Sequence, residues 1–132
     1  SPYGVFNGMK GDDDGVEDLH EALARALSTI GLVYLHVVDH SAMGAPEVKA
    51  SVKRKLREAF RGAYVLSGGY DRDRAEADLV EKRGDLVAFG RPFIANPRLV
   101  TRLRDRKALA APDFATFYTP GEKGYSDYPA EA

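Results

Sequence analysis

The sequence predicts an α/β fold with parallel strands, and two observations support this prediction. The 132 residues alternate between amphipathic helical patterns and short apolar runs that are rich in β-branched and aromatic residues. Each apolar run is separated from the next by a helical pattern, which is typical of βαβ units and a parallel sheet. Right-handed connections then bring the carboxyl ends of all the strands to one edge of the sheet.

The first predicted helix covers residues 16–30, because apolar residues recur there at steps of three and four. These residues are Val16, Leu19, Leu23, Ala26, Leu27 and Ile30. Gly31 is well placed to end this helix in a left-handed conformation. The run LVYLHVVD, residues 32–39, follows it and is predicted to be a strand that is covered on both faces.

A second helix is expected to begin at Pro46, which suits a first helical position. Its buried residues are predicted to be Val48, Val52, Leu56, Ala59 and Phe60. The run AYVLSGGY, residues 63–70, is the next strand with its terminating glycines. Asp71 can then cap a third helix that extends to Lys82. The inward-facing residues of that helix are predicted to be Ala75, Leu79 and Val80.

The last predicted strand covers residues 86–89, and the pair Asn96-Pro97 is expected to cap a fourth helix. The apolar residues of that helix are Leu99, Val100 and Leu103. Residues 108–132 contain prolines, glycines and aromatic residues but show no period. We therefore expect an irregular aromatic tail there, and a loop at residues 1–14.

Three complete βα units cannot finish a sheet whose strands are apolar on both faces, and a closed (βα)8 barrel needs about 250 residues. One interpretation is a small open α/β sandwich. The segment SPYGVFNG, residues 1–8, favours a barrel, because it resembles a turn that should follow a strand. We therefore expect residues 1–132 to form a single partial TIM (βα)8 barrel that contains roughly its last three units.

Composition argues against several classes of function. The formal net charge of -1 offers no basic field for nucleic acid or for an anionic membrane. No apolar run approaches the roughly 20 residues that span a bilayer, and no signal peptide is recognised. Cysteine is absent, which excludes disulfides and fits a cytoplasmic location. His20, His36 and His40 lack a metal-ligand spacing, so we expect no metal site.

Glycines follow two consecutive predicted strands, as Gly68 and Gly69 after one and as Gly90, with Arg91, after the next. Because consecutive units are neighbours in a barrel, both turns are expected at one rim. Glycine lets backbone N–H groups approach an anion closely, and an arginine adds a planar cation that suits phosphate oxygens. The alternatives are a simple tight turn at the glycine pair and a surface ion pair at Arg91.

Several segments together resemble the carboxyl-terminal half of the old yellow enzyme family, which comprises FMN-dependent ene-reductases built on a (βα)8 barrel. The segments are SPYGVFNGM, YLHVV, VLSGGY, DLVAFGRPFIANPRLV, ATFY and GYSDYP. Their order and spacing match from Ser1 to about Pro129. The resemblance implies that the predicted strands are strands six to eight of the barrel, and that Ser1 lies just past strand five.

The resemblance also implies roles for individual residues. Gly68, Gly69, Gly90 and Arg91 match the family's positions that bind the FMN phosphate. Three aromatic residues match positions near the flavin and the substrate. Of these, Tyr118 is assigned to the cofactor, and Phe6 and Phe117 to the substrate. Alternatively, Phe6 is ordinary core, and the two aromatic residues of the tail pin it to the barrel. His36 is interpreted as a wall residue.

The leading hypothesis is therefore the carboxyl-terminal portion of an FMN-dependent NAD(P)H oxidoreductase that reduces activated alkenes. The resemblance implies that the proton donor and the substrate ligands come from the first half of the barrel. We therefore assign no catalytic residue to this chain and expect it to be inactive by itself. One alternative is a non-catalytic partial barrel that binds FMN or phosphate, or only self-associates. Another is a different phosphate-binding barrel enzyme.

The strands are expected to present an apolar face that this chain cannot cover. Each large side chain left exposed forfeits roughly 1.5–3 kcal/mol, so a rigid lone monomer is disfavoured. We expect self-association, a complementing N-terminal half-barrel, or partial disorder in residues 1–14 and in the tail.

Overall fold

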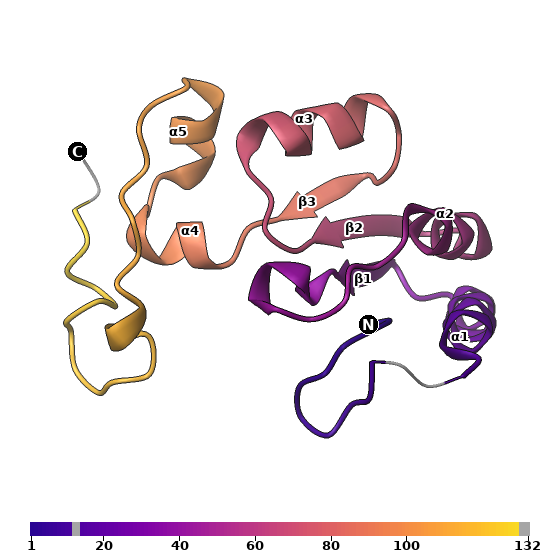
Figure 1. The fold of residues 1–132 in the computed structure, drawn as a ribbon. Coiled ribbons are helices and arrows are strands. Elements are labelled where there is room, and N and C mark those ends of the chain that lie inside the picture. Colours follow the sequence, from indigo (N-terminus) through magenta and orange to yellow (C-terminus); the bar gives the residue numbers. More distant parts are fainter. Residues whose placement is uncertain (12–13, 130–132) are drawn as a thin grey trace. The chain divides into compact units, whose positions relative to one another are not determined.

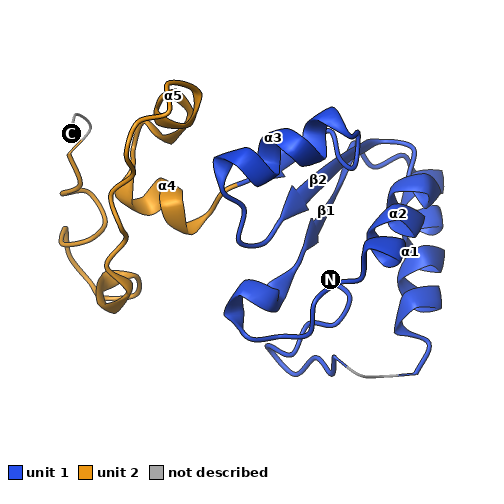
Figure 2. Ribbon diagram, turned by 45° about the horizontal axis from the view of Figure 1, so that its top comes forward, with its two compact units in different colours: residues 1–88 blue, residues 89–132 orange. Residues whose placement is uncertain are grey.

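The computed structural model describes residues 1–11 and 14–129 (Figure 1). The chain divides into two compact units, residues 1–88 and residues 89–132, which Figure 2 shows in different colours. Residues 12–13 and 130–132 lie outside the described residues, and so do the expectations made for them within the loop and the tail. Within the described residues, no helix is both long and apolar enough to cross a membrane.

The first unit contains a three-stranded parallel sheet with the order β1-β2-β3, which confirms the predicted arrangement. The strands are β1 (Tyr34–Val38), β2 (Ala63–Ser67) and β3 (Leu86–Ala88). Val38 pairs with Ser67, and Ser67 pairs with Ala88. The carboxyl ends of all three strands therefore lie at one edge, as expected for consecutive βα units.

The helices of the first unit agree with the prediction most closely where local sequence sets their ends. They are α1 (Val16–Ile30), α2 (Ala50–Ala59) and α3 (Arg72–Val80). At the end of α1, Gly31 has a φ of 84° and returns its N–H to the last turn. At the start of α3, the side chain of Asp71 accepts a hydrogen bond from the N–H of Arg74 at 2.8 Å. Both predicted caps are confirmed.

The start of α2 was predicted wrongly, because residues 46–49 are not helical and the helix begins at Ala50. Val48 is fully buried in this non-helical segment, so its burial does not require a helix. A short 3-10 helix, η1 (His40–Met43), comes before it and was not predicted. The five residues predicted to be buried in this region are all buried: Val48, Val52, Leu56, Ala59 and Phe60.

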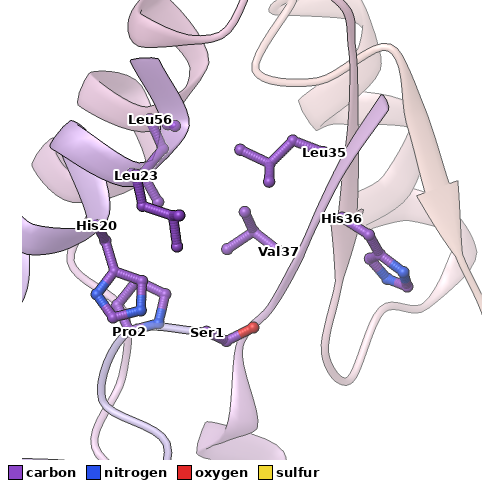
Figure 3. Close-up of a pocket in the computed structure, with 9 residues that line it drawn as sticks. Ser1, Pro2, His20, Leu23, Leu35, His36, Val37 and Leu56 are labelled. Carbon is purple, nitrogen blue, oxygen red and sulfur yellow. The ribbon is translucent and has the colours of Figure 1, made fainter. Parts of the chain in front are cut away.

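One face of β1 packs against helices and the other is open. The prediction of two covered faces therefore does not hold within this chain, whereas the expectation of a face that the chain cannot cover does. Leu35 and Val37 point towards α1 and α2, whereas His36 points to the opposite side of the strand (Figure 3). On the open face, Tyr34 is 59% exposed and Leu86 of β3 is 56% exposed. The sheet does not close around this face, which explains why large apolar side chains stay exposed there.

Two helix faces also differ from the prediction. In α1 the buried residue is Ala24, whereas most of the predicted apolar stripe is exposed, namely Leu19, Leu23, Ala26 and Ile30. In α3, Leu79 and Val80 are exposed and Asp78 is buried. The Asp78 carboxylate accepts hydrogen bonds from Tyr70 at 2.6 Å and from Arg83 at 2.7 Å. These partners allow a charged residue to take an inward position.

The second unit begins just after β3 and consists of short helices and irregular chain. Its helices are α4 (Arg91–Ala95), α5 (Leu99–Arg104) and the 3-10 helix η2 (Phe114–Thr116). Leu99 is buried as predicted, but Val100 is 67% exposed. The Asn96 side chain does not cap α5, because it bonds instead to the backbone of Pro92 and Ala110. The predicted capping role of Asn96 was therefore wrong.

Candidate functional site

Three segments that are distant in the sequence meet at the carboxyl edge of the sheet. The N–H of Val38 donates to Ser1 Oγ at 3.0 Å. The rings of Phe6 and His40 lie 5.5 Å apart with an interplanar angle of 59°. The N–H of Asp39 donates to the carbonyl of Ser67 at 2.8 Å. The structure therefore places the predicted substrate residue Phe6 at the edge where β1 ends.

The glycine pair after β2 is required by the fold itself. Gly68 has a φ of 119° and Gly69 a φ of 62°, which are conformations that other residues rarely adopt. A Cβ atom on Gly68 would lie 2.0 Å from the carbonyl oxygen of Asp39, and one on Gly69 would lie 2.7 Å from Cβ of Ala42. The tight-turn interpretation therefore accounts for both glycines, and it leaves a second role in ligand binding open to them.

A buried ion pair adjoins this glycine turn. The Asp39 carboxylate accepts hydrogen bonds from Lys53 Nζ at 2.6 Å and from the N–H of Ser41 at 3.0 Å. Burial by itself raises the pKa of Asp39, but the hydrogen bonds from Lys53 and Ser41 outweigh burial and hold the pKa below its usual value. The carboxylate is therefore ionised at neutral pH.

Gly90 differs from the other two glycines. Its φ is −95°, and a Cβ atom built on it would meet no described atom within 4 Å. Neither φ nor packing among the described residues therefore requires a glycine here. Arg91 is the first residue of α4, which was not predicted, and its guanidinium lies 5.9 Å from the ring centre of Phe114.

The two glycine turns begin at the same edge of the sheet. Ser67 pairs with Ala88 within the first unit, and Gly68 follows Ser67 directly. Gly90 follows Ala88 by two residues along the chain. Convergence of Gly68, Gly69, Gly90 and Arg91 on one anion pocket stays a prediction.

The aromatic residues of the tail form a cluster of their own within the second unit. The Phe117 ring lies 4.9 Å from the ring of Phe114 and 6.4 Å from that of Tyr118. Tyr118 is 97% exposed, and its ring is therefore available to a ligand. The N–H of Asp113 donates to the hydroxyl of Tyr128 at 2.9 Å. The assignments of Tyr118 to the cofactor and Phe117 to the substrate stay predictions.

Sequence reasoning missed the polar contacts that hold these segments. The hydroxyl of Tyr3 donates to Glu17 Oε1 at 2.5 Å, and Lys49 Nζ donates to the same oxygen at 3.0 Å. The guanidinium of Arg74 stacks 4.2 Å from the ring centre of Tyr70. The sequence offered one signal for such contacts, and it concerned the ion pair of Asp39 and Lys53. Asp39 directly follows an apolar strand, and a charged residue in that place must find a partner.

A small cavity of about 100 Å³ lies between α1, α2 and β1 (Figure 3). Its lining includes His20, Leu23, Leu35 and Leu56, and none of the predicted site residues. Nδ1 of His20 lies 2.7 Å from the carbonyl of Val16 in the same helix, so this nitrogen is occupied. Among the described residues, no group of histidine, aspartate and glutamate side chains is arranged to hold a metal ion.

Comparison with protein families places most of the chain in a known family. The model of the NADH:flavin oxidoreductase / NADH oxidase family matches residues 1–110. A 12-oxophytodienoate reductase-like protein of Solanum lycopersicum is 38% identical over 94% of this chain and 33% of its own length. The 12-oxophytodienoate reductase 2 of Arabidopsis thaliana is 32% identical over 98% of this chain and 35% of its own length. The chain thus spans about a third of these two relatives.

Solved structures show the same partial match. A variant of morphinone reductase in complex with tetrahydroNAD is 40% identical, with a TM-score of 0.85 over 97% of this chain and 34% of that chain. A variant of NCR from Zymomonas mobilis is 32% identical, with a TM-score of 0.82 over 97% of this chain and 40% of that chain. These matches and the parallel sheet confirm the predicted fold, a partial TIM barrel whose sheet is not closed.

Proposed function

Because the chain belongs to the NADH:flavin oxidoreductase / NADH oxidase family, we propose that it is the carboxyl-terminal part of an FMN-dependent NAD(P)H oxidoreductase that reduces activated alkenes. In this proposal the chain supplies the binding site for the FMN phosphate. FMN, when bound, would supply the hydride-transfer chemistry that connects NAD(P)H with the alkene, and the residues of this chain would hold it.

Gly90 is the observation that supports the phosphate site most directly. Neither φ nor packing among the described residues requires a glycine at this position. The absent side chain would let a ligand approach the backbone closely, which is the use that we propose for it. Arg91 follows it with a permanent positive charge and a planar set of donors that matches phosphate oxygens. The residues present therefore fit the phosphate group of FMN.

The other proposed contacts divide into those to the FMN phosphate, the flavin and the substrate. Gly68 and Gly69 present a turn with positive φ at the carboxyl edge of β2, a conformation that exposes backbone N–H groups to an anion. Phe6 contributes an aromatic face to the substrate side of the site, beside His40. We assign the exposed ring of Tyr118 to the flavin and Phe117 to the substrate wall. These residues bind and orient ligands, and none of them moves a proton.

Titration of the chain with FMN, followed by quenching of flavin fluorescence, tests the phosphate site. Arg91→Ala should weaken FMN binding about tenfold, because a charge-assisted contact to phosphate is lost. Arg104→Ala is the matched control, because Arg104 lies in the same unit and pairs with Asp105 on the surface. An unchanged dissociation constant for Arg91→Ala would remove Arg91 from the site.

The open face of the sheet favours a second candidate, a non-catalytic partial barrel that binds FMN or only self-associates. Tyr34 and Leu86 are exposed there, on strands that the proposed enzyme would cover. Oxidation of NADPH by the purified chain with cyclohexenone and FMN tests whether this chain is active by itself, which neither candidate expects. We expect no turnover, because this chain supplies no general acid. Turnover by the chain alone would show that the first half of the barrel is dispensable.

A further inference from the structure

The buried ion pair of Asp39 and Lys53 takes no part in the function proposed above. Asp39 directly follows β1, and Lys53 lies in the first half of α2. Their side chains are 2% and 20% exposed and are joined at 2.6 Å. Removal of one partner would leave the other charge buried and uncompensated, because burial has already removed its hydration.

The backbone of Asp39 determines the shape of the glycine turn. Its N–H donates to Ser67, the residue that precedes the turn. Its carbonyl oxygen occupies the space that a Cβ atom on Gly68 would need. The Cβ atom of Ala42 likewise occupies the space that a Cβ atom on Gly69 would need. The turn is therefore packed against the segment that begins at Asp39.

The carboxylate of Asp39 in turn fixes that segment. It accepts the N–H of Ser41 and so caps η1, which carries Ala42. Lys53 holds the same carboxylate from α2. A continuous set of contacts thus runs from Lys53 through Asp39 to Gly68 and Gly69.

We infer that Asp39 and Lys53 are positioning residues that hold the Gly68-Gly69 turn in the conformation that binds a phosphate group. The second half of this inference rests on the proposed function. In this inference the ion pair does not contact the ligand itself. It sets where the backbone of the turn lies, and an error of about 1 Å in such a group is enough to impair a binding site.

The test compares Lys53→Met with Lys53→Arg, which keeps the charge, and with Arg57→Met as a matched control. Arg57 pairs with Asp85 at 2.8 Å, at the opposite, amino end of β2 and β3. Two quantities are measured on the purified chain. The first is the position of the Gly68 and Gly69 amide resonances by NMR, and the second is the dissociation constant for FMN.

Lys53→Met should shift both glycine resonances and weaken FMN binding about tenfold. Lys53→Arg should keep the dissociation constant within about twofold of the original, and Arg57→Met should leave both quantities unchanged. Loss with methionine and rescue by arginine would show that the effect depends on the positive charge at position 53, and the Arg57→Met control separates it from general stability. If Lys53→Met does not fold, Lys53→Gln replaces it with the same expected results.

Unmoved glycine resonances in Lys53→Met would overturn the inference, whether or not FMN binds. Equal shifts of the glycine resonances in Arg57→Met would also overturn the inference, because they would indicate a general loss of packing in the first unit. Shifted resonances with an unchanged dissociation constant would overturn the link to phosphate. A chain that binds no FMN before any substitution would contradict the proposed function, and the glycine resonances would still decide the positioning role.

Discussion

Glycines that look equivalent in the sequence have different physical reasons for lacking a side chain. Gly68 and Gly69 have positive φ values and lie against the backbone of Asp39 and the side chain of Ala42. Gly90 has an ordinary φ and open space around the missing Cβ atom. Substitution by alanine should therefore separate folding from binding at these positions.

Gly68→Ala should lower the free energy of unfolding by at least about 2 kcal/mol, because the new Cβ atom would collide with the carbonyl of Asp39. Gly90→Ala should change the same quantity by less than about 1 kcal/mol while weakening FMN binding. Urea unfolding and flavin fluorescence measure the two effects. Loss of stability in Gly90→Ala would show that this glycine serves the fold.

The pKa of Asp39 predicts a dependence of stability on pH. Lys53 and Ser41 hold the pKa of the folded state below its ordinary value of 3.8, so the carboxylate stabilises the fold above that value. This contribution is lost as the pH falls from about 3.8 through the lower pKa of the folded state. The difference in unfolding free energy between the chain and Asp39→Asn should therefore shrink between pH 7 and pH 3, and a difference that grows instead would contradict the assignment.

At the scale of elements, the sequence predicted features that depend on neighbouring residues and missed those that depend on distant ones. Gly31 and Asp71 end and begin their helices through local hydrogen bonds, and both were identified correctly. The inward face of α3 was predicted correctly at Ala75 and wrongly at Leu79 and Val80. Asp78 is buried instead, through contacts with Tyr70 and Arg83. Apolar periodicity contains no information about such partners.

In the candidate site, too, the sequence predicted local features and missed those that depend on distant residues. The two glycine turns were found from the sequence, because glycines directly after apolar strands are a local signal. The pair of Asp39 and Lys53 was missed, because its members are 14 residues apart on different elements. The helix that begins at Arg91 was missed as well, since Pro92 near its start was taken as part of a loop.

The cap of α3 gives a prediction at this scale. Asp71→Ala should lower the free energy of unfolding by about 1 kcal/mol, because the N–H of Arg74 loses its acceptor. Asp73→Ala, in the first turn of the same helix, is the control and should cost less, because Asp73 pairs with Arg72 at the surface. Thermal or urea unfolding measures both, and equal losses would indicate that Asp71 acts only through its charge.

At the scale of the whole molecule, the open face of the sheet is the main physical problem of this chain. Tyr34 and Leu86 are more than half exposed on the two outer strands of one sheet. Burial of one such side chain is worth roughly 1.5–3 kcal/mol, a large part of the about 5–15 kcal/mol that stabilises a typical domain. The free energy therefore favours any state in which this face is covered.

We expect the purified chain to self-associate, with a mass that rises with concentration in light scattering. Leu86→Asp should reduce this association, because it places a charge on the open face. Val100→Asp is the control, because Val100 is also more than half exposed but lies on α5. A compact, cooperatively folding monomer at all concentrations would count heavily against the need for a covered face.

The position of the buried Asn96 before a proline affects its rate of deamidation. Its side-chain amide holds Pro92 and Ala110 together, so conversion to aspartate would replace two N–H donors with a buried charge. Asparagine deamidates mainly when the next backbone nitrogen, as an N–H group, attacks the side chain to form a succinimide. The next residue is Pro97, which has no N–H. Asn96 is therefore protected from deamidation through a succinimide.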